Sequence, residues 1–246
     1  MIEDLLIVAA GMGTRLRARG NLKPLVEVGG TPLIEHAIRA AFAAGLKRAT
    51  VVTGYHSKIL ERFLTELVDR TGWQINTVHN PDFMYPNGLS VLKAASVLSG
   101  PFCLAMCDHL VEPKLYSRLL ATKLGKGEVG LAIDSRLENP FVDLADVTRV
   151  RNVVGRIVNI GKNIPVYNAF DAGIFAAGPA LFDAIEKSGR ETKDFSISGG
   201  MTMLAAQNKA RAIDVGDSFW IDVDCPEMHD LAEGWLKSSQ IVAEAG

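Results

Sequence analysis

Cysteine is scarce in this 246-residue sequence, and its scarcity argues against a disulfide-stabilised fold. Only Cys103, Cys107 and Cys225 are present, and their spacing contains no Cys-x-x-Cys pair that would form a zinc site with His109. Two of the three lie in or beside apolar runs. We therefore interpret the cysteines as small core residues, which suits the reducing cytoplasm.

A strong net charge and long apolar runs are also missing. The formal net charge is −2, which argues against nucleic acid or an anionic membrane as a partner. No apolar stretch reaches the roughly 18 residues that span a bilayer, and the chain opens on Glu3 and Asp4 instead of a basic targeting segment. We expect a cytoplasmic protein with a small ligand.

Apolar runs rich in β-branched residues alternate with segments of helical period in the first part of the chain. Strands are predicted over residues 5–9, 49–53, 74–79, 102–106 and 129–133, and helices over residues 33–44, 57–70 and 89–98. This alternation predicts an α/β fold with a mostly parallel sheet flanked by helices. In such sheets ligands bind beyond the carboxyl ends of the strands.

The pattern changes after about residue 140. Shorter strand-like pieces at residues 146–151, 156–160 and 172–176 predict a small β-rich flap. Helical spacing returns over 179–187 and 198–208, strands are predicted at 212–217 and 219–223, and a terminal helix is predicted from Pro226 to about residue 242.

A glycine loop follows the first predicted strand. Gly11 and Gly13 can adopt backbone angles that other residues avoid, so that consecutive N–H groups turn inward around a polyphosphate. Arg15 and Lys23 add fixed positive charge. A dinucleotide-binding loop would need a third glycine at Leu16, and no P-loop Gly-Lys-Ser/Thr is present. An ordinary glycine-rich turn is the alternative, which the two cations disfavour.

Carboxylates follow two of the predicted strands. Asp108 closes the strand at 102–106, and Asp222 and Asp224 close a later one, where strand alternation places both on the same face. Alone, each also fits a turn or a solvated strand end. Mg²⁺ takes oxygen ligands from carboxylates and substrate phosphates, so together with the basic loop these residues predict a metal facing a triphosphate.

Other polar residues admit two interpretations. Lys162, after a glycine turn, is either solvated surface or the ligand of a second substrate's phosphate, in which case Asp171 accepts hydrogen bonds from that substrate's hydroxyls. Asn87 or Ser90 can cap the helix that begins there. Alternatively, Gly88 lets the backbone approach a flat nucleobase whose edge is read by the neighbouring polar groups.

Several of these motifs together resemble the sugar-phosphate nucleotidyltransferases, and the resemblance covers nearly the whole chain. It rests on Ala-Ala-Gly-Met-Gly-Thr-Arg-Leu, Leu-Lys-Pro-Leu, the strand end at Asp108 and the late Val-Asp-Cys-Pro-Glu segment. Within that family, Asn-Gly-Leu-Ser, Met-Cys-Asp-His, Ile-Gly-Lys-Asn and Tyr-Asn-Ala-Phe-Asp-Ala-Gly-Ile-Phe are most similar to the CTP:inositol-1-phosphate cytidylyltransferases.

The resemblance implies a Rossmann-like sheet of the nucleotide-diphospho-sugar transferase, GT-A-like type, in a single domain over residues 1–246. Residues 1–135 would mainly bind nucleotide, 136–225 would mainly bind the acceptor, and 226–246 would form a C-terminal helix. The implied reaction converts CTP and inositol 1-phosphate to CDP-inositol and pyrophosphate, by in-line attack of the acceptor phosphate on the α-phosphorus, with Mg²⁺.

The resemblance also assigns roles to particular positions. Arg15 and Lys23 would be catalytic, Lys162 and Asp171 would bind the acceptor, and Asp108 with Asp224 would hold Mg²⁺, Asp222 being the less favoured ligand. The implied nucleotide-binding residues are Ala10, Gly11, Met12, Gly13, Thr14, Arg15, Lys23, Asn87, Gly88, Ser90 and Asp108.

Alternatives remain open within and outside this family. A cytidylyltransferase for phosphocholine or a phosphonate, or a hexose-1-phosphate nucleotidyltransferase, would share the nucleotide motifs. Choline would call for an aromatic cage, and the low aromatic content of 7% favours a polyol. A glycosyltransferase would also carry Asp-x-Asp, without the basic glycine loop. The resemblance leaves open a homodimer and a downstream membrane CDP-alcohol transferase as partners.

Overall fold

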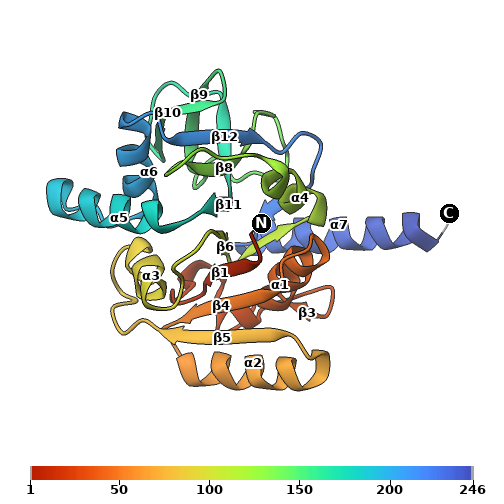
Figure 1. Ribbon diagram of the computed structural model, residues 1–246. Helices are drawn as coiled ribbons and strands as arrows, with labels where there is room; N and C mark the ends of the chain where they lie inside the picture. The colour runs from red at the N-terminus through yellow and green to blue at the C-terminus, as the bar shows by residue number, and fades with distance from the viewer. Residues whose placement is uncertain (1, 245–246) are drawn as a thin grey trace.

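A mixed nine-stranded sheet runs through the computed structural model, which describes residues 2–244 (Figure 1). Four neighbouring strands on one side are parallel, whereas β11 runs antiparallel to both β6 and β8 in the middle of the sheet. The strand order is β5 (Gln74–His79), β4 (Arg48–Thr53), β1 (Asp4–Val8), β6 (Phe102–Met106), β11 (Ala169–Ala177), β8 (Val129–Asp134), β12 (Ala210–Asp214), β10 (Arg156–Gly161) and β9 (Arg149–Val153).

The second half of the sheet closes on itself. Strand β9 pairs with β10 and also returns to pair with β11, so that β11, β8, β12, β10 and β9 form a small barrel. This barrel contains the predicted β-rich flap. The α/β fold class is confirmed, but the sheet is mixed instead of mostly parallel: the parallel pairs join β5, β4, β1 and β6 in one half and β8 with β12 in the other, and the remaining pairs are antiparallel.

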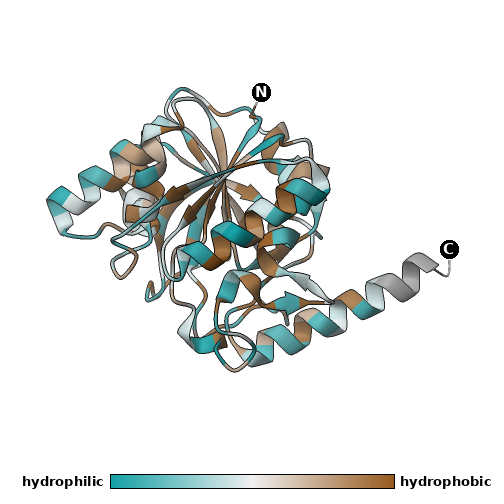
Figure 2. Ribbon diagram, turned by 90° about the horizontal axis from the view of Figure 1, so that it is seen from below, coloured by the Kyte–Doolittle hydropathy of each residue, from teal (hydrophilic) through white to brown (hydrophobic). Residues whose placement is uncertain are grey.

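Helices cover both faces of the sheet because alternate strand residues point to opposite sides. On β1, Leu5 and Ile7 pack in one cluster with three helices, and Leu6 and Val8 pack in a second with three others. The first three are α1 (Leu33–Ala43), α2 (Ser57–Thr71) and α4 (Pro113–Ala121); the second three are α3 (Gly88–Lys93), α5 (Pro179–Thr192) and α6 (Ile197–Ala206). Figure 2 shows the hydrophilic residues on the outer sides of these helices.

A third apolar cluster holds the last helix, α7 (Pro226–Glu244), which extends away from the sheet in both ribbon views (Figures 1 and 2). There Phe219 stacks on Trp235 with ring centroids 3.6 Å apart. The hairpin of β2 (Glu27–Val28) and β3 (Thr31–Pro32) lies in the same region. Among residues 2–244, no helix combines the length and apolar character that a bilayer crossing requires.

Two elements that matter for the site were not predicted from the sequence. Strand β7 (His109–Val111) follows β6 after a two-residue turn and pairs antiparallel with β13 (Trp220–Asp222), with His109 opposite Asp222. The N–H of Val223 then donates to the carbonyl of Asp108 at 2.9 Å. This short ladder brings two distant acidic segments side by side. Helix α4, which follows β7, was also missed.

Three other predicted elements have different boundaries in the structure. The strand predicted at 146–151 begins at Arg149 because residues 143–147 form a turn, in which the N–H of Val147 donates to the carbonyl of Asp143. The strand predicted at 212–217 is β12, which ends at Asp214. The helix predicted over 89–98 is α3 followed by a 3₁₀ turn, Ala94–Ser96.

Candidate active site

The loop after β1 wraps closely around Lys23. Gly13 has φ +55°, and a Cβ placed on it would lie 2.3 Å from Cβ of Lys23, so the loop requires glycine here. Gly11 is outside the positive-φ region, and a Cβ on it would meet nothing within 4 Å. The expectation that both glycines use special backbone angles is therefore wrong for Gly11.

Lys23 lies in a 3₁₀ turn (Lys23–Leu25) and is only 7% exposed. Its Nζ is 2.6 Å from Oδ2 of Asp108 and also contacts the carboxylate of Asp224. Burial would lower the pKa of Lys23, but Asp108 and Asp222 raise it above its ordinary value. The basic loop and both acidic strand ends thus face one cleft, as the sequence predicted.

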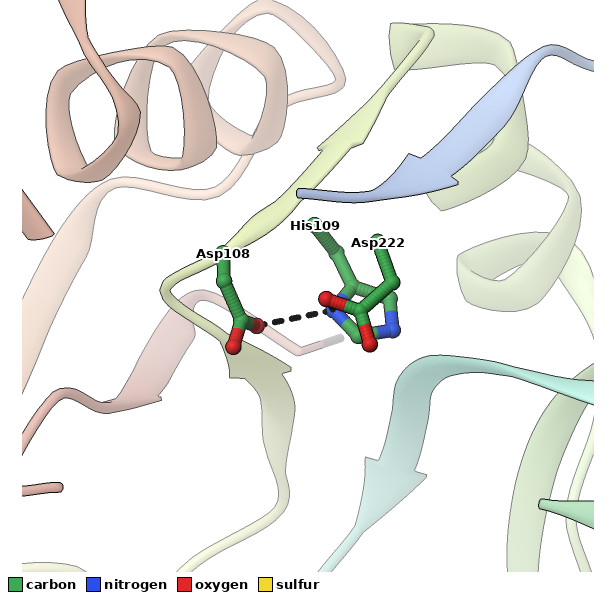
Figure 3. A group of neighbouring side chains, drawn as sticks. All are labelled: Asp108, His109 and Asp222. Carbon is green, nitrogen blue, oxygen red and sulfur yellow. Dashed lines mark hydrogen bonds and ion pairs between the residues drawn. The ribbon is translucent and has the colours of Figure 1, made fainter. Parts of the chain in front are cut away.

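Asp108 also contacts His109, which the sequence had not singled out (Figure 3). Nδ1 of His109 lies 2.9 Å from Oδ1 of Asp108 and 3.9 Å from Oδ1 of Asp222, and the ring stacks on Trp220. Burial would lower the pKa of His109, but Asp222, Asp108 and Asp171 raise it to about 9. The ring is therefore protonated at neutral pH and donates to Asp108.

The charge of Asp108 is maintained by these neighbours. Burial would raise its pKa, but Lys23 and His109 hold the pKa of Asp108 well below its usual range. The adjacent position of His109 in Met-Cys-Asp-His was the only sequence signal for its part in the site.

Asp222 has a buried oxygen with no hydrogen-bond partner in the part of the chain that the structure describes. This atom is Oδ1, and burial together with Asp108 raises the pKa of the carboxyl. Ligand atoms of Asp222 lie within 4.8 Å of those of Asp108 and His109, and also of those of Asp146 and Asp224. An orphaned carboxylate oxygen among other carboxylates fits a divalent cation, which prefers oxygen ligands.

Asp146 links the two halves of the cleft. Its Oδ2 accepts from Nη2 of Arg15 at 2.8 Å, and its Oδ1 accepts from Nζ of Lys162 at 2.5 Å. Burial would raise the pKa of Asp146, but Lys162 and Arg15 lower it. Arg15 also contacts Asp224. No sequence pattern marked Asp146, because it lies in the irregular segment before β9.

Two neighbouring cavities meet at these charges, and Arg15, Asn87, Met106, Asp108 and Asp224 line both. The first, of about 310 Å³, is also lined by Gly11, Gly13, Thr14, Lys23, Phe83, Tyr85 and Ser90. The second, of about 250 Å³, is also lined by His109, Phe141, Asp146, Lys162, Asp171, Phe175, Trp220 and Asp222. The structure therefore separates the predicted nucleotide residues from the predicted acceptor residues and joins the two groups at Arg15 and Asp108.

Three predicted nucleotide residues, Ala10, Met12 and Gly88, do not line either cavity. A Cβ on Gly88 would lie 2.2 Å from the carbonyl oxygen of Phe195, so this glycine is required by packing. Oδ1 of Asn87 does not cap α3, the helix that follows it; it accepts at 3.0 Å from the N–H of Ile197, the first residue of α6. The side chain of Ser90 does not cap α3 either, so the capping interpretation was wrong.

Asp171 and Gly173 form a bulge in β11 at the second cavity. The N–H of Gly173 donates to Oδ1 of Asp171 at 2.7 Å, and a Cβ on Gly173 (φ +73°) would lie 2.4 Å from the ring of His109. Burial raises the pKa of Asp171 to about 6, against the lowering effects of the Gly173 N–H and of His109. The glycine therefore makes room for the imidazole beside the Asp171 carboxyl.

Several known proteins are similar to this chain in sequence. The sequence is 37% identical over 237 residues to the "Bifunctional IPC transferase and DIPP synthase" of Rubrobacter xylanophilus, covering 94% of this chain and 52% of that protein. A protein of the same name from Thermococcus kodakarensis is 31% identical, with 92% and 48% covered. The chain thus spans about half the length of these curated relatives.

Solved structures show the same fold. The inositol-1-phosphate CTP transferase from T. maritima superposes with a TM-score of 0.83 at 22% identity, covering 94% of this chain and 95% of that one. A UDP-glucose pyrophosphorylase complexed with UDP-glucose superposes with a TM-score of 0.80 at 19% identity, covering 97% and 100%. Both support the nucleotide-diphospho-sugar transferase fold. Because residues 5–162 match the family model described as "MobA-like NTP transferase domain", this chain belongs to that family of nucleotidyltransferases.

Proposed function

We propose that the protein is a Mg²⁺-dependent cytidylyltransferase that converts CTP and inositol 1-phosphate to CDP-inositol and pyrophosphate. The observation that carries the proposal is the position of Lys23, whose Nζ contacts Asp108 and Asp224 where the two cavities meet. The similarity to the bifunctional IPC transferase of Rubrobacter xylanophilus and to the inositol-1-phosphate CTP transferase from T. maritima supports the choice of substrates.

In this proposal the loop after β1 binds the triphosphate. Backbone N–H groups around Gly13, together with Arg15 and Lys23, compensate the phosphate charge. Arg15 exchanges its present partner Asp146 for a phosphate oxygen. The same cations stabilise the charge that develops on departing pyrophosphate.

The acceptor enters the second cavity. Lys162 binds its phosphate, and Asp171 accepts hydrogen bonds from the ring hydroxyls. A phosphate oxygen forms the new bond to the α-phosphorus of CTP while the bond to the β-phosphate oxygen breaks. Since the acceptor phosphate is already anionic at neutral pH, alignment and charge compensation replace a general base.

The carboxylates of Asp108 and Asp224, with Asp222 beside them, are the residues that would hold Mg²⁺. When bound, the ion would compensate the negative charge of the phosphate groups. Asp108→Asn and Asp224→Asn should each shift the Mg²⁺ concentration that gives half-maximal activity. Unchanged titration curves in both variants would contradict this assignment.

Phosphocholine is the second candidate acceptor. Phe141, Phe175 and Trp220 line the second cavity, which is more aromatic than the sequence led us to expect. A cage of this kind suits a quaternary ammonium group. That group has no hydrogen-bond donor or acceptor, whereas Lys162, His109 and Asp171 in the same cavity are suited to binding hydroxyls. This balance favours the polyol.

The test is a matrix of CTP, UTP, GTP and ATP against inositol 1-phosphate, phosphocholine and glucose 1-phosphate, with pyrophosphate release as the readout. CTP with inositol 1-phosphate should give the highest kcat/KM, and a clear preference for another pair would overturn the substrate assignment. Lys162→Ala should raise the KM for the acceptor while leaving the KM for CTP within about threefold. Lys187→Ala, a similarly exposed lysine on α5, is the matched control. A homodimer and a membrane CDP-alcohol transferase acting on the product remain predictions.

A further inference from the structure

Asn80 is a buried polar residue at the end of β5 that the proposed reaction does not use. Its side chain is held at both ends, and the residue is 1% exposed. Oδ1 accepts from the backbone N–H of Asp82 at 2.9 Å, and Nδ2 donates to Oγ of Ser90 at 2.9 Å. The backbone N–H of Asn80 donates to the carbonyl of Thr53 at 2.8 Å, which fixes the residue beside β4.

The direction of the bond to Ser90 follows from the chemistry of these partners. A backbone N–H can only donate, so the amide atom that faces Asp82 must be the oxygen, and the atom that faces Ser90 must be the NH₂ group. The hydroxyl of Ser90 therefore accepts from Asn80. Its own proton points elsewhere, and among residues 2–244 the structure records no acceptor for that proton.

Ser90 lines the first cavity together with Gly11, Gly13, Phe83 and Tyr85. The two aromatic side chains provide flat apolar surface, and Ser90 is only 4% exposed. A hydroxyl whose orientation is fixed at such a surface can distinguish a base that presents an acceptor from one that presents a donor. Cytosine presents an acceptor at N3, whereas uracil presents an N–H donor at the same position.

We propose that Asn80 is a positioning residue that selects cytosine over uracil, by orienting the Ser90 hydroxyl as a donor toward N3 of the base. This inference rests on the proposed function, because it takes the first cavity as the site of the nucleoside triphosphate. It adds a residue that neither touches the substrate nor belongs to the charged centre of the site.

The decisive variant is Asn80→Asp. The new carboxylate has nearly the same shape and still accepts from the N–H of Asp82, but its second oxygen must accept from Ser90. The Ser90 proton then turns away from the cavity, and its lone pairs face the base. Because CTP and UTP carry the same triphosphate, any repulsion from the added negative charge cancels in the ratio of their kcat/KM values.

The experiment measures kcat/KM for CTP and for UTP at pH 8, by pyrophosphate release with saturating inositol 1-phosphate. Reversing one hydrogen bond should lower the CTP-to-UTP ratio of Asn80→Asp at least about tenfold relative to the unmodified protein. Asn76→Asp, which adds the same charge at an exposed position of β5, is the matched control and should leave the ratio unchanged. A ratio in Asn80→Asp within about twofold of the unmodified protein overturns the inference.

Ser90→Ala keeps the test decisive if Asn80→Asp does not fold, as judged by thermal melting. Loss of the donor should lower kcat/KM for CTP about tenfold and leave that for UTP within about threefold. An unchanged ratio in Ser90→Ala also overturns the inference. Failure of the proposed function looks different, because the unmodified protein would then release no pyrophosphate from CTP and inositol 1-phosphate. In that case the same ratio is measured with whichever acceptor the matrix identifies.

Discussion

Replacing Lys23 by methionine tests the charge arrangement of the site. The substitution keeps most of the side-chain volume and removes the cation between three carboxylates. The side chains of Lys23 and Asp108 are 8% and 15% exposed, and Nζ of Lys23 also contacts Asp224 and lies 4.0 Å from Asp222. Removing one partner of a buried ion pair costs about 3–5 kcal/mol, because the remaining charge stays buried. The free energy of unfolding should fall by that amount.

An exposed pair in the same protein provides the control. Nζ of Lys47 lies 2.6 Å from Oε1 of Glu3, the same distance as in the buried pair, but Lys47 is 64% exposed. Exposed ion pairs contribute about 0–1 kcal/mol. Lys47→Met should therefore change the free energy of unfolding several times less than Lys23→Met, although the two contacts have the same length.

Urea unfolding with and without Mg²⁺ measures both effects. Mg²⁺ should recover part of the stability of Lys23→Met, because a cation then again compensates the carboxylates. Turnover should remain at least about a hundredfold lower, since the loss of one preorganised charge-stabilising group has this scale. Equal unfolding free energies for Lys23→Met and Lys47→Met, or near-normal turnover in Lys23→Met, would refute the reasoning.

Three further predictions concern single side chains of the site. Gly13→Ala should lower turnover more than tenfold because the new Cβ would overlap Lys23, and the positive φ alone should destabilise the protein by about 1–2 kcal/mol. Gly11→Ala, whose Cβ would meet no protein atom, should leave the free energy of unfolding nearly unchanged, and urea unfolding of the two variants measures the difference. Asp171→Asn should raise the melting temperature more at pH 8 than at pH 4. Burial raises the pKa of Asp171 to about 6 in the folded protein. The contribution of this carboxyl to stability is therefore present below its ordinary pKa and is lost as the pH rises through about 6, where the uncharged amide has no such loss. An equal shift at both pH values would contradict this. Asp222→Asn should stabilise the metal-free protein, because burial and a neighbouring carboxylate disfavour its charge, and yet raise the Mg²⁺ concentration needed for half-maximal activity; melting scans and activity titrations with Mg²⁺ measure the two opposite effects.

Local sequence signals were enough to predict the core of the fold. The strands β1, β4 and β6 are apolar or β-branched over nearly their whole length, and β5 has three β-branched residues among polar ones. The helices between them have clear amphipathic spacing. The glycine loop was recognisable because the positive φ of Gly13 and its close contact with Lys23 both require a glycine at this position. The face-to-face position of Lys23 and Asp108 followed from the rule that ligands bind at the carboxyl ends of parallel strands.

Features that depend on distant partners could not be read from local patterns. Strand β7 has only three residues, too few for a period, and it forms because β13 pairs with it. Asp146 lies in an irregular segment, so its contacts with Arg15 and Lys162 depend entirely on the tertiary fold. Asn87 was expected to cap the helix that follows it, but its oxygen binds the first N–H of the distant helix α6, at Ile197.

The pairing of β7 with β13 has a consequence for biosynthesis. The ribosome adds the glycine loop and Asp108 early, whereas Asp222 and Asp224 follow more than a hundred residues later. Until that late segment emerges and docks, Lys23 has only its contact with Asp108, and the pocket for a divalent ion is incomplete. A nascent chain could therefore bind nucleotide before it can use it, and catalytic competence would arrive only when β13 has emerged and paired with β7.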